Sequence, residues 1–206
     1  MVPENEKLSL VSSRLEALGD GIFSVAMTIL VINLALPSVN GNTWTNFAAA
    51  IRQSASGYLC YVISFVVLGI MWFGHRMMFE YIGRTNRYFI FLGVLFYMVV
   101  CLVPFSTRFL AENRQWQSIM VYGLNLSLCN LTLFAQWIYG INNPNLMHKA
   151  LPDEVKKEAK DLFLLSPVVY SIAIGLSFFV PLVSIIIFAV TPILYLIPNK
   201  LDKYLP

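Results

Sequence analysis

The chain has 206 residues, of which 58% are apolar and 12% are charged, and its formal net charge is +3. Soluble domains are typically about 45–50% apolar and about 25% charged, and the mean hydropathy here is +0.69. This composition argues against a water-soluble domain. The small, scattered positive charge does not predict a nucleic-acid partner.

Six apolar segments are long enough to cross a bilayer, whose hydrocarbon core of roughly 30 Å needs about 20 residues of helix. They lie at about residues 18–37, 55–74, 88–107, 116–139, 162–179 and 182–198. The last two are separated at Pro181, because proline removes a backbone donor and disfavours helix just before it. We therefore expect an all-α membrane protein with a single six-span transmembrane domain over residues 1–206.

The lysines and arginines are distributed unequally between alternate loops. One side of the predicted membrane holds Lys7, Arg14, Arg76, Arg84, Arg87, Lys149, Lys156, Lys157, Lys160, Lys200 and Lys203. The other side holds only Arg52, Arg108 and Arg114. Because cytoplasmic loops carry an excess of basic residues, this pattern predicts that both termini are cytoplasmic, which also requires an even number of spans.

The first apolar segment contains an ionisable side chain. Ser13 and Glu16 fit a capping box, so we expect the helix to begin near Arg14, with Asp20 about two turns further on. An ionisable group inside a span normally has a partner. Candidate partners for Asp20 are Arg14 and, at the end of the second span, Trp72 and His75. Alternatively, Asp20 simply favours the positive end of the helix and reaches water.

A helical wheel separates three faces of this first segment. An apolar stripe contains Ile22, Val25, Ile29, Ile32 and Leu36. Beside it lies a stripe of small residues, Ala17, Gly21, Ser24 and Thr28, which would allow close helix approach. Bulky residues occupy the opposite side, at Phe23, Leu30 and Leu34. The apolar stripe either packs against protein or lipid, or, in symmetry-related copies around an axis, stacks as rings that gate a pore by dewetting.

Residues 14–29, RLEALGDGIFSVAMTI, resemble the first-helix signature of the transmembrane protein 175 family, the endolysosomal potassium channels and their prokaryotic relatives. That signature is an arginine, three variable residues, Phe-Ser-Asp, and an Ile/Leu-rich helix with an internal threonine. Further similarities follow in order at residues 69–75, 86–87 and 103–107, and cover roughly the first 112 residues. Two departures are Leu18-Gly19 in place of Phe-Ser and the small Val25 in place of isoleucine or leucine.

The resemblance implies a homotetramer of six-helix chains in a bacterial plasma membrane, with the first helix lining a central pore for potassium ions. By position, Val25, Ile29 and Ile32 would form the hydrophobic constriction, with the hydroxyl of Thr28 beside it. By the same resemblance, a polar network would hold the cytoplasmic ends of the first two helices, formed by Arg14, Asp20, Trp72 and His75.

The expected function is a passive, potassium-selective cation channel. The chain has no Thr-Val-Gly-Tyr-Gly filter sequence, so an ion would lose water at apolar rings, which hinders the weakly hydrated potassium ion least. Thr28 either offers an oxygen to the ion or bonds back to the carbonyl of Ser24. The alternative is a small secondary transporter that uses Asp20 and His75 as a proton relay.

Other chemistry has little support in the sequence. We find no Ser-His-Asp, zinc-ligand or phosphate-cradling pattern, so we expect no enzyme, no metal and no cofactor, with potassium only as the permeant ion. The fourth span carries the amides Asn125, Asn130 and Gln136, which we expect to bond between helices. The three cysteines lie inside apolar segments and predict no disulfide framework.

Overall fold

The computed structural model describes residues 4–35, 37–38, 41, 43–113, 115–149 and 152–196, and these residues are almost entirely helical. Its seven α-helices and one short 3₁₀ helix are α1 (Glu4–Ile32), α2 (Trp44–Phe79), α3 (Arg87–Val100), α4 (Val103–Glu112), α5 (Trp116–Ile141), η1 (Pro144–Leu146), α6 (Asp153–Ser177) and α7 (Pro181–Leu196). The break expected at Pro181 is present, since α7 begins at this residue.

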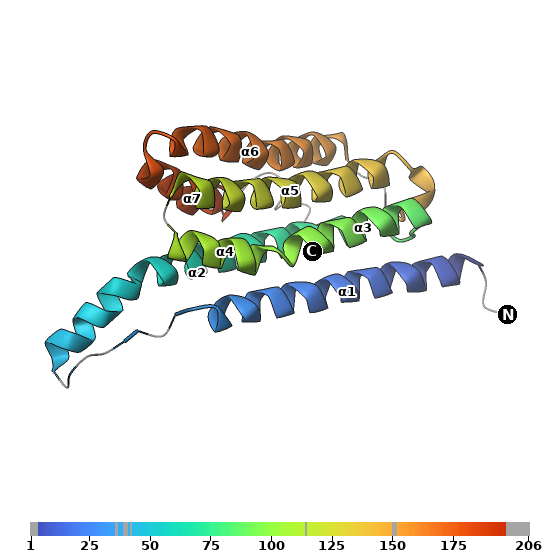
Figure 1. Ribbon diagram of the computed structural model, residues 1–206. Coiled ribbons are helices and arrows are strands. Elements are labelled where there is room, and N and C mark those ends of the chain that lie inside the picture. Colours follow the sequence, from blue (N-terminus) through green and yellow to red (C-terminus); the bar gives the residue numbers. More distant parts are fainter. Residues whose placement is uncertain are drawn as a thin grey trace.

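The helices form an elongated bundle in which α1 and α6 lie at opposite edges (Figure 1). Helix α1 packs on α2, α3 and α4, whereas α6 packs on α5 and α7. The first turns of α2 project beyond the rest of the bundle (Figure 1). Because α1 lies at an edge, it has one face packed on its own chain and one face free.

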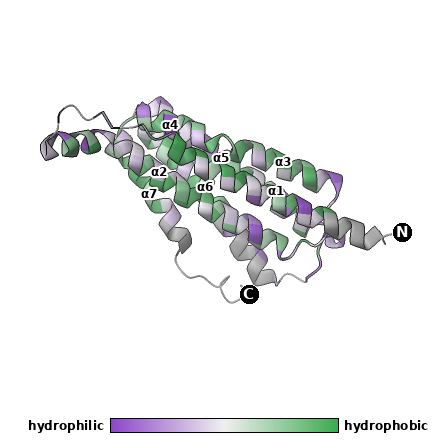
Figure 2. Cartoon of the chain, turned by 90° about the horizontal axis from the view of Figure 1, so that it is seen from below, coloured by the Kyte–Doolittle hydropathy of each residue, from purple (hydrophilic) through white to green (hydrophobic). Residues whose placement is uncertain are grey.

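Within the described ranges, four segments are long and apolar enough to cross a membrane: Val11–Ile32, Trp44–Phe79, Arg87–Glu112 and Trp116–Ile141. The apolar parts of α6 and α7 are shorter, at Phe163–Ser177 and Pro181–Pro192. Hydrophobic residues recur along the helices of the bundle (Figure 2), and many large hydrophobic side chains are exposed on its surface. Such a surface fits lipid and not water, so the chain is a helical membrane protein.

Helix α1 begins earlier than the sequence predicts. It runs from Glu4, so Ser13 lies inside the helix and does not cap it, contrary to our expectation of a start near Arg14. No glycine or proline interrupts residues 4–13, and the buried hydroxyl of Ser12 donates to the carbonyl of Ile82 at 3.2 Å. The part of α1 that precedes Arg14 is therefore packed, through Ser12, against the chain just after α2. At the other end the helix stops at Ile32, and Leu36 lies outside the described residues.

The segment predicted as one helix at residues 88–107 is two helices. Helix α3 ends at Val100 and α4 begins at Val103, with Pro104 in the first turn of α4. Proline has no backbone N–H and its ring clashes with the preceding turn, which breaks the regular hydrogen bonding. The break leaves Cys101 exposed beside α1.

Two loops are joined at one end of the bundle. The amide of Gly83 donates to the carbonyl of Leu146 at 3.0 Å, and Lys149 pairs with Glu80 at 3.1 Å. Together with the contact of Ser12 described above, these bonds bring the ends of α2 and α5 close to Ser12, in the first half of α1. The loops that the charge count assigns to one side of the membrane are thus neighbours in space.

Candidate ion pathway along the first helix

The free face of α1 is apolar. Val25 is 57% exposed, Ile29 is 38% exposed and Ile32 is 75% exposed, although each is a large hydrophobic side chain. On the opposite face, Phe23 and Leu30 are buried at 1% and 2% exposure. The periodicity correctly placed Phe23 and Leu30 on the face opposite the stripe, and of the alternatives left open for Val25, Ile29 and Ile32, packing into the core of their own chain does not occur.

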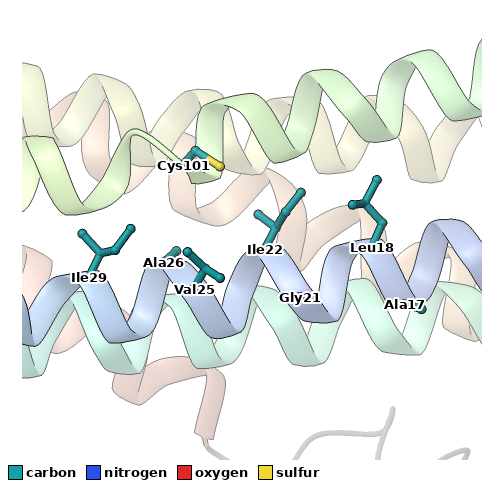
Figure 3. Close-up of a pocket in the computed structure, with 8 residues that line it drawn as sticks. All are labelled: Ala17, Leu18, Gly21, Ile22, Val25, Ala26, Ile29 and Cys101. Atoms are coloured by element: carbon teal, nitrogen blue, oxygen red, sulfur yellow. The ribbon is translucent and has the colours of Figure 1, made fainter.

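Part of this free face forms the floor of a shallow groove of about 350 Å³ (Figure 3). The groove is lined by Ala17, Leu18, Gly21, Ile22, Val25, Ala26, Ile29 and Cys101. Its lining is almost wholly apolar, so it presents no ring of oxygens that could replace the water around a cation. Val25 and Ile29 contribute to it, while Ile32 lies one turn further along the helix.

Thr28 lies on the same exposed side of α1. Its hydroxyl donates to the carbonyl of Val25 at 2.8 Å, so the hydroxyl does bond back within the helix, as one of the two alternatives had it, but to Val25 and not to Ser24. Bonds to the third or the fourth preceding carbonyl are both common for threonine in helices. The hydroxyl proton is used inside the helix, but the lone pairs of the oxygen remain available beside the apolar stripe.

The predicted partners Asp20 and Trp72 are joined. The indole Nε1 of Trp72 donates to Oδ1 of Asp20 at 2.7 Å, and the pair lies on an exposed surface between α1 and α2. The guanidinium carbon of Arg76 lies 5.9 Å from the centroid of the Trp72 ring, within the range of a cation–π contact. Arg14 is exposed and, within the described part of the chain, forms no hydrogen bond or ion pair with these residues.

His75 belongs to a separate, buried group. Its Nε2 lies 2.8 Å from the hydroxyl of Tyr97, and that hydroxyl donates to the backbone carbonyl of Leu15 at 2.8 Å. Three helices meet in this group, since His75 comes from α2, Tyr97 from α3 and Leu15 from α1. The ring of His75 is surrounded by Phe23, Phe79 and Phe96 at centroid distances of 6.0, 4.9 and 5.8 Å.

Tyr97 is a site residue that sequence reasoning missed. The available signal was a hydroxyl inside an otherwise apolar span, because a buried tyrosine O–H usually finds a hydrogen-bond partner. Its partner His75 lies on a different helix, so the pairing depends on how α2 and α3 pack and not on local spacing. The structure therefore divides the four predicted polar residues into an Asp20–Trp72 pair, a His75–Tyr97 group and Arg14, which joins neither of them.

Gly19 explains how these helices approach so closely. A Cβ atom at position 19 would lie 2.6 Å from Cε1 of His75 and 2.8 Å from the hydroxyl oxygen of Tyr97. Essentially no real Cβ contact is so short, so a side chain here would displace a buried ring. At the position where the resemblance leads us to expect a serine hydroxyl, this chain has Gly19, and a hydroxyl from Tyr97 on α3 contacts His75 instead.

Two of the three buried amides of α5 bond to another helix, as expected. Asn125 donates to the carbonyl of Val99 at 3.4 Å and Gln136 to that of Phe89 at 3.5 Å, which joins α5 to α3. Asn130 instead donates within its own helix. Among the described residues, no group of three or more histidine, cysteine, aspartate or glutamate side chains could hold a metal ion.

These features define a multi-span helical membrane protein with an exposed apolar face on its first helix. The family model described as endosomal/lysosomal potassium channel TMEM175 matches residues 14–104. A protein of Streptomyces collinus named as a potassium channel is 31% identical over 174 residues, which cover 81% of this chain and 82% of that protein. The chain belongs to the TMEM175 family.

Two further relatives extend the similarity beyond the first helices. A protein of Chryseobacterium, also named as a potassium channel, is 25% identical over 93% of this chain and 95% of its own length. The crystal structure of a lysosomal potassium-selective channel TMEM175 homolog from Chamaesiphon minutus superimposes with a TM-score of 0.78 at 25% identity, covering 90% of this chain and 96% of that chain. The likeness of fold therefore includes α5 to α7, where the family model does not reach.

Proposed function

We propose that this chain is the subunit of a potassium-selective channel, a homotetramer in which α1 of each protomer lines a central pore. The observation that carries the proposal is the apolar stripe of Val25, Ile29 and Ile32, exposed on α1 at one edge of the bundle. Membership of a family whose relatives are named potassium channels supports the same conclusion.

In this proposal the stripe forms stacked apolar rings around the axis. A cation passing the rings loses part of its hydration shell, and the rings supply no oxygen in exchange. Potassium holds its water more weakly than sodium, so potassium is hindered less and selectivity is modest. The oxygen of Thr28, one per protomer, would be the nearest protein ligand beside the rings.

The polar contacts of Asp20 and His75 would keep α1 in place against α2 and α3. The Asp20–Trp72 bond ties the outer side of α1 to α2, and His75 ties its packed side through Tyr97. Arg14, exposed at the same end, would take its partner from a neighbouring protomer, a lipid headgroup or water.

We place the chain in a bacterial plasma membrane, with six crossings and both termini in the cytoplasm. The basic residues Arg84, Arg87 and Lys149 lie at the end where the two loops are joined, and basic loops face the cytoplasm. The Streptomyces and Chryseobacterium relatives are bacterial. In this arrangement α6 and α7 complete an even number of spans.

A secondary transporter is less consistent with these contacts. A proton relay between Asp20 and His75 requires that the two groups exchange a proton, directly or through a partner. In the described residues Asp20 bonds to Trp72 and His75 bonds to Tyr97, and no hydrogen bond connects the two pairs. The relatives named above are channels, which favours passive flux.

The decisive experiment compares potassium and sodium flux through purified protein in liposomes. We expect Val25→Asn and Ile29→Asn to raise total flux several-fold and to lower the preference for potassium, because amides hydrate the apolar rings. The matched control is Val31→Asn, since Val31 is 50% exposed on the same helix but lies about 120° around it from Val25. Unchanged flux in both ring variants, or a transporting species whose measured mass is that of a monomer, contradicts the proposal.

A further inference from the structure

We infer that Tyr97 is a positioning residue of the pore helix, because its hydroxyl fixes the proton of His75 on Nε2 and ties the pair to the backbone of α1. This inference rests on the proposed function for its consequence in the pore, but its chemistry depends only on the contacts of three helices. Neither the family signature nor the sequence pattern pointed to residue 97.

The position of the proton follows from counting donors. A tyrosine hydroxyl has one hydrogen, and the hydroxyl of Tyr97 donates it to the carbonyl of Leu15, which can only accept. The contact of 2.8 Å between this hydroxyl and Nε2 of His75 is then a hydrogen bond only if Nε2 is the donor. Nε2 of His75 therefore carries a proton.

The surroundings leave His75 no other arrangement. The side chain is 0% exposed, and within the described residues Nδ1 has no hydrogen-bond partner. Phenylalanine rings enclose the imidazole, so a flipped or doubly protonated ring would place a donor against apolar groups, which is unfavourable. His75 is therefore the neutral Nε2–H tautomer with the lone pair on Nδ1, and within the described residues its hydrogen bond to Tyr97 determines which nitrogen holds the proton.

The same contacts fix how α1 is placed. Leu15 accepts the bond from Tyr97, and Gly19, one turn later, lies against both His75 and Tyr97 without room for a side chain. Val25 lies six residues beyond Gly19, about 9 Å along the helix axis. Because a helix turns as one body, a rotation at Gly19 would turn Val25 away from the pore axis by the same angle.

The first test reads the tautomer directly. The chain has only two histidines, His75 and His148, so nitrogen NMR of the full-length protein labelled in its histidine rings can be assigned with a His148→Gln variant. We expect His75 to show one protonated nitrogen, Nε2, and one unprotonated nitrogen, Nδ1. We expect Tyr97→Phe to replace this single form by a mixture of tautomers. An Nδ1–H tautomer in the natural chain, or the same single tautomer in Tyr97→Phe, overturns the inference.

The second test reads the position of α1 through selectivity. Loss of one net hydrogen bond corresponds to a roughly two- to tenfold change in an equilibrium, and we expect Tyr97→Phe to change the potassium-to-sodium flux ratio within that range. The control is Tyr88→Phe, since Tyr88 is on the same helix but 70% exposed; its ratio should not change. An unchanged ratio in Tyr97→Phe overturns the positioning role. If the natural chain conducts no potassium, the proposed function is wrong. The tautomer measurement does not depend on conduction and still tests the position of the proton on His75.

Discussion

The two faces of α1 are built on different principles. The packed face has residues of specific shape and polarity: a glycine where no Cβ fits, a backbone carbonyl that accepts from Tyr97, and Phe23 in an aromatic cluster. The free face has only size and apolarity in common, at Val25, Ile29 and Ile32. Substitutions on the packed face should therefore change the free energy of unfolding, whereas substitutions on the free face should change ion flux.

The largest expected effect is on the packed face. Phe23 is 1% exposed and contacts the rings of His75 and Phe96. Truncating such a side chain leaves a cavity and typically costs about 3–5 kcal/mol. We expect Phe23→Ala to lower the free energy of unfolding by that amount, as measured by chemical or thermal unfolding of the detergent-solubilised protein.

The control for this prediction is Phe91→Ala, because Phe91 is 65% exposed on α3 and its truncation leaves no cavity. Its free energy of unfolding should change by less than about 1 kcal/mol. Equal losses of unfolding free energy in Phe23→Ala and Phe91→Ala would mean that burial of a side chain does not determine its contribution to stability.

A smaller effect is expected at the edge between the two faces, where Asp20 accepts from Trp72. The pair is exposed, so its contribution to the free energy of unfolding should be about 0.5–1 kcal/mol. We expect Trp72→Phe to lose this amount and Asp20→Asn to lose less, since an asparagine oxygen still accepts the indole N–H. A double-mutant cycle between the two positions measures the coupling.

The Asp20→Asn variant also distinguishes a passive channel from a transporter with a proton relay. An amide cannot carry a proton as a carboxylate does, so a relay through Asp20 would stop in Asp20→Asn. We expect passive potassium flux to remain within about twofold of that of the natural chain, as for a surface change. A complete loss of transport with a folded protein would favour the relay.

The sequence was sufficient for two features whose information is local. The 3.6-residue periodicity of α1 separated Phe23 and Leu30 from Val25, because a helical wheel needs nothing beyond the positions along one helix. Pro181 correctly marked a helix start. Pro104 was an equally local signal for the break between α3 and α4, but the apolar run around it is continuous, and hydropathy alone favoured one helix.

The remaining features depend on which helices meet. The extension of α1 to Glu4 accompanies the contact of Ser12 with Ile82, 70 residues away in the chain. Likewise, His75 could pair with Asp20 or Tyr97 as far as spacing is concerned, and only the packing of α3 against α1 brings Tyr97 to it. Hydrogen-bond partners between helices are therefore the part of the site that sequence patterns leave open.

The smallest expected effect concerns Thr28, whose hydroxyl lies beside the apolar stripe. Its proton is held by the carbonyl of Val25, so only lone pairs face outward, and one oxygen per protomer replaces little of the hydration shell of an ion. We expect Thr28→Val to lower the potassium-to-sodium flux ratio by no more than about twofold and Thr28→Ser to leave it unchanged, because serine keeps the same backbone bond. A larger fall in Thr28→Val than in Ile29→Asn would mean that hydroxyl oxygens, and not the size of the apolar rings, determine selectivity. The free face would then share the chemical specificity of the packed face, and the contrast between them would be one of burial alone.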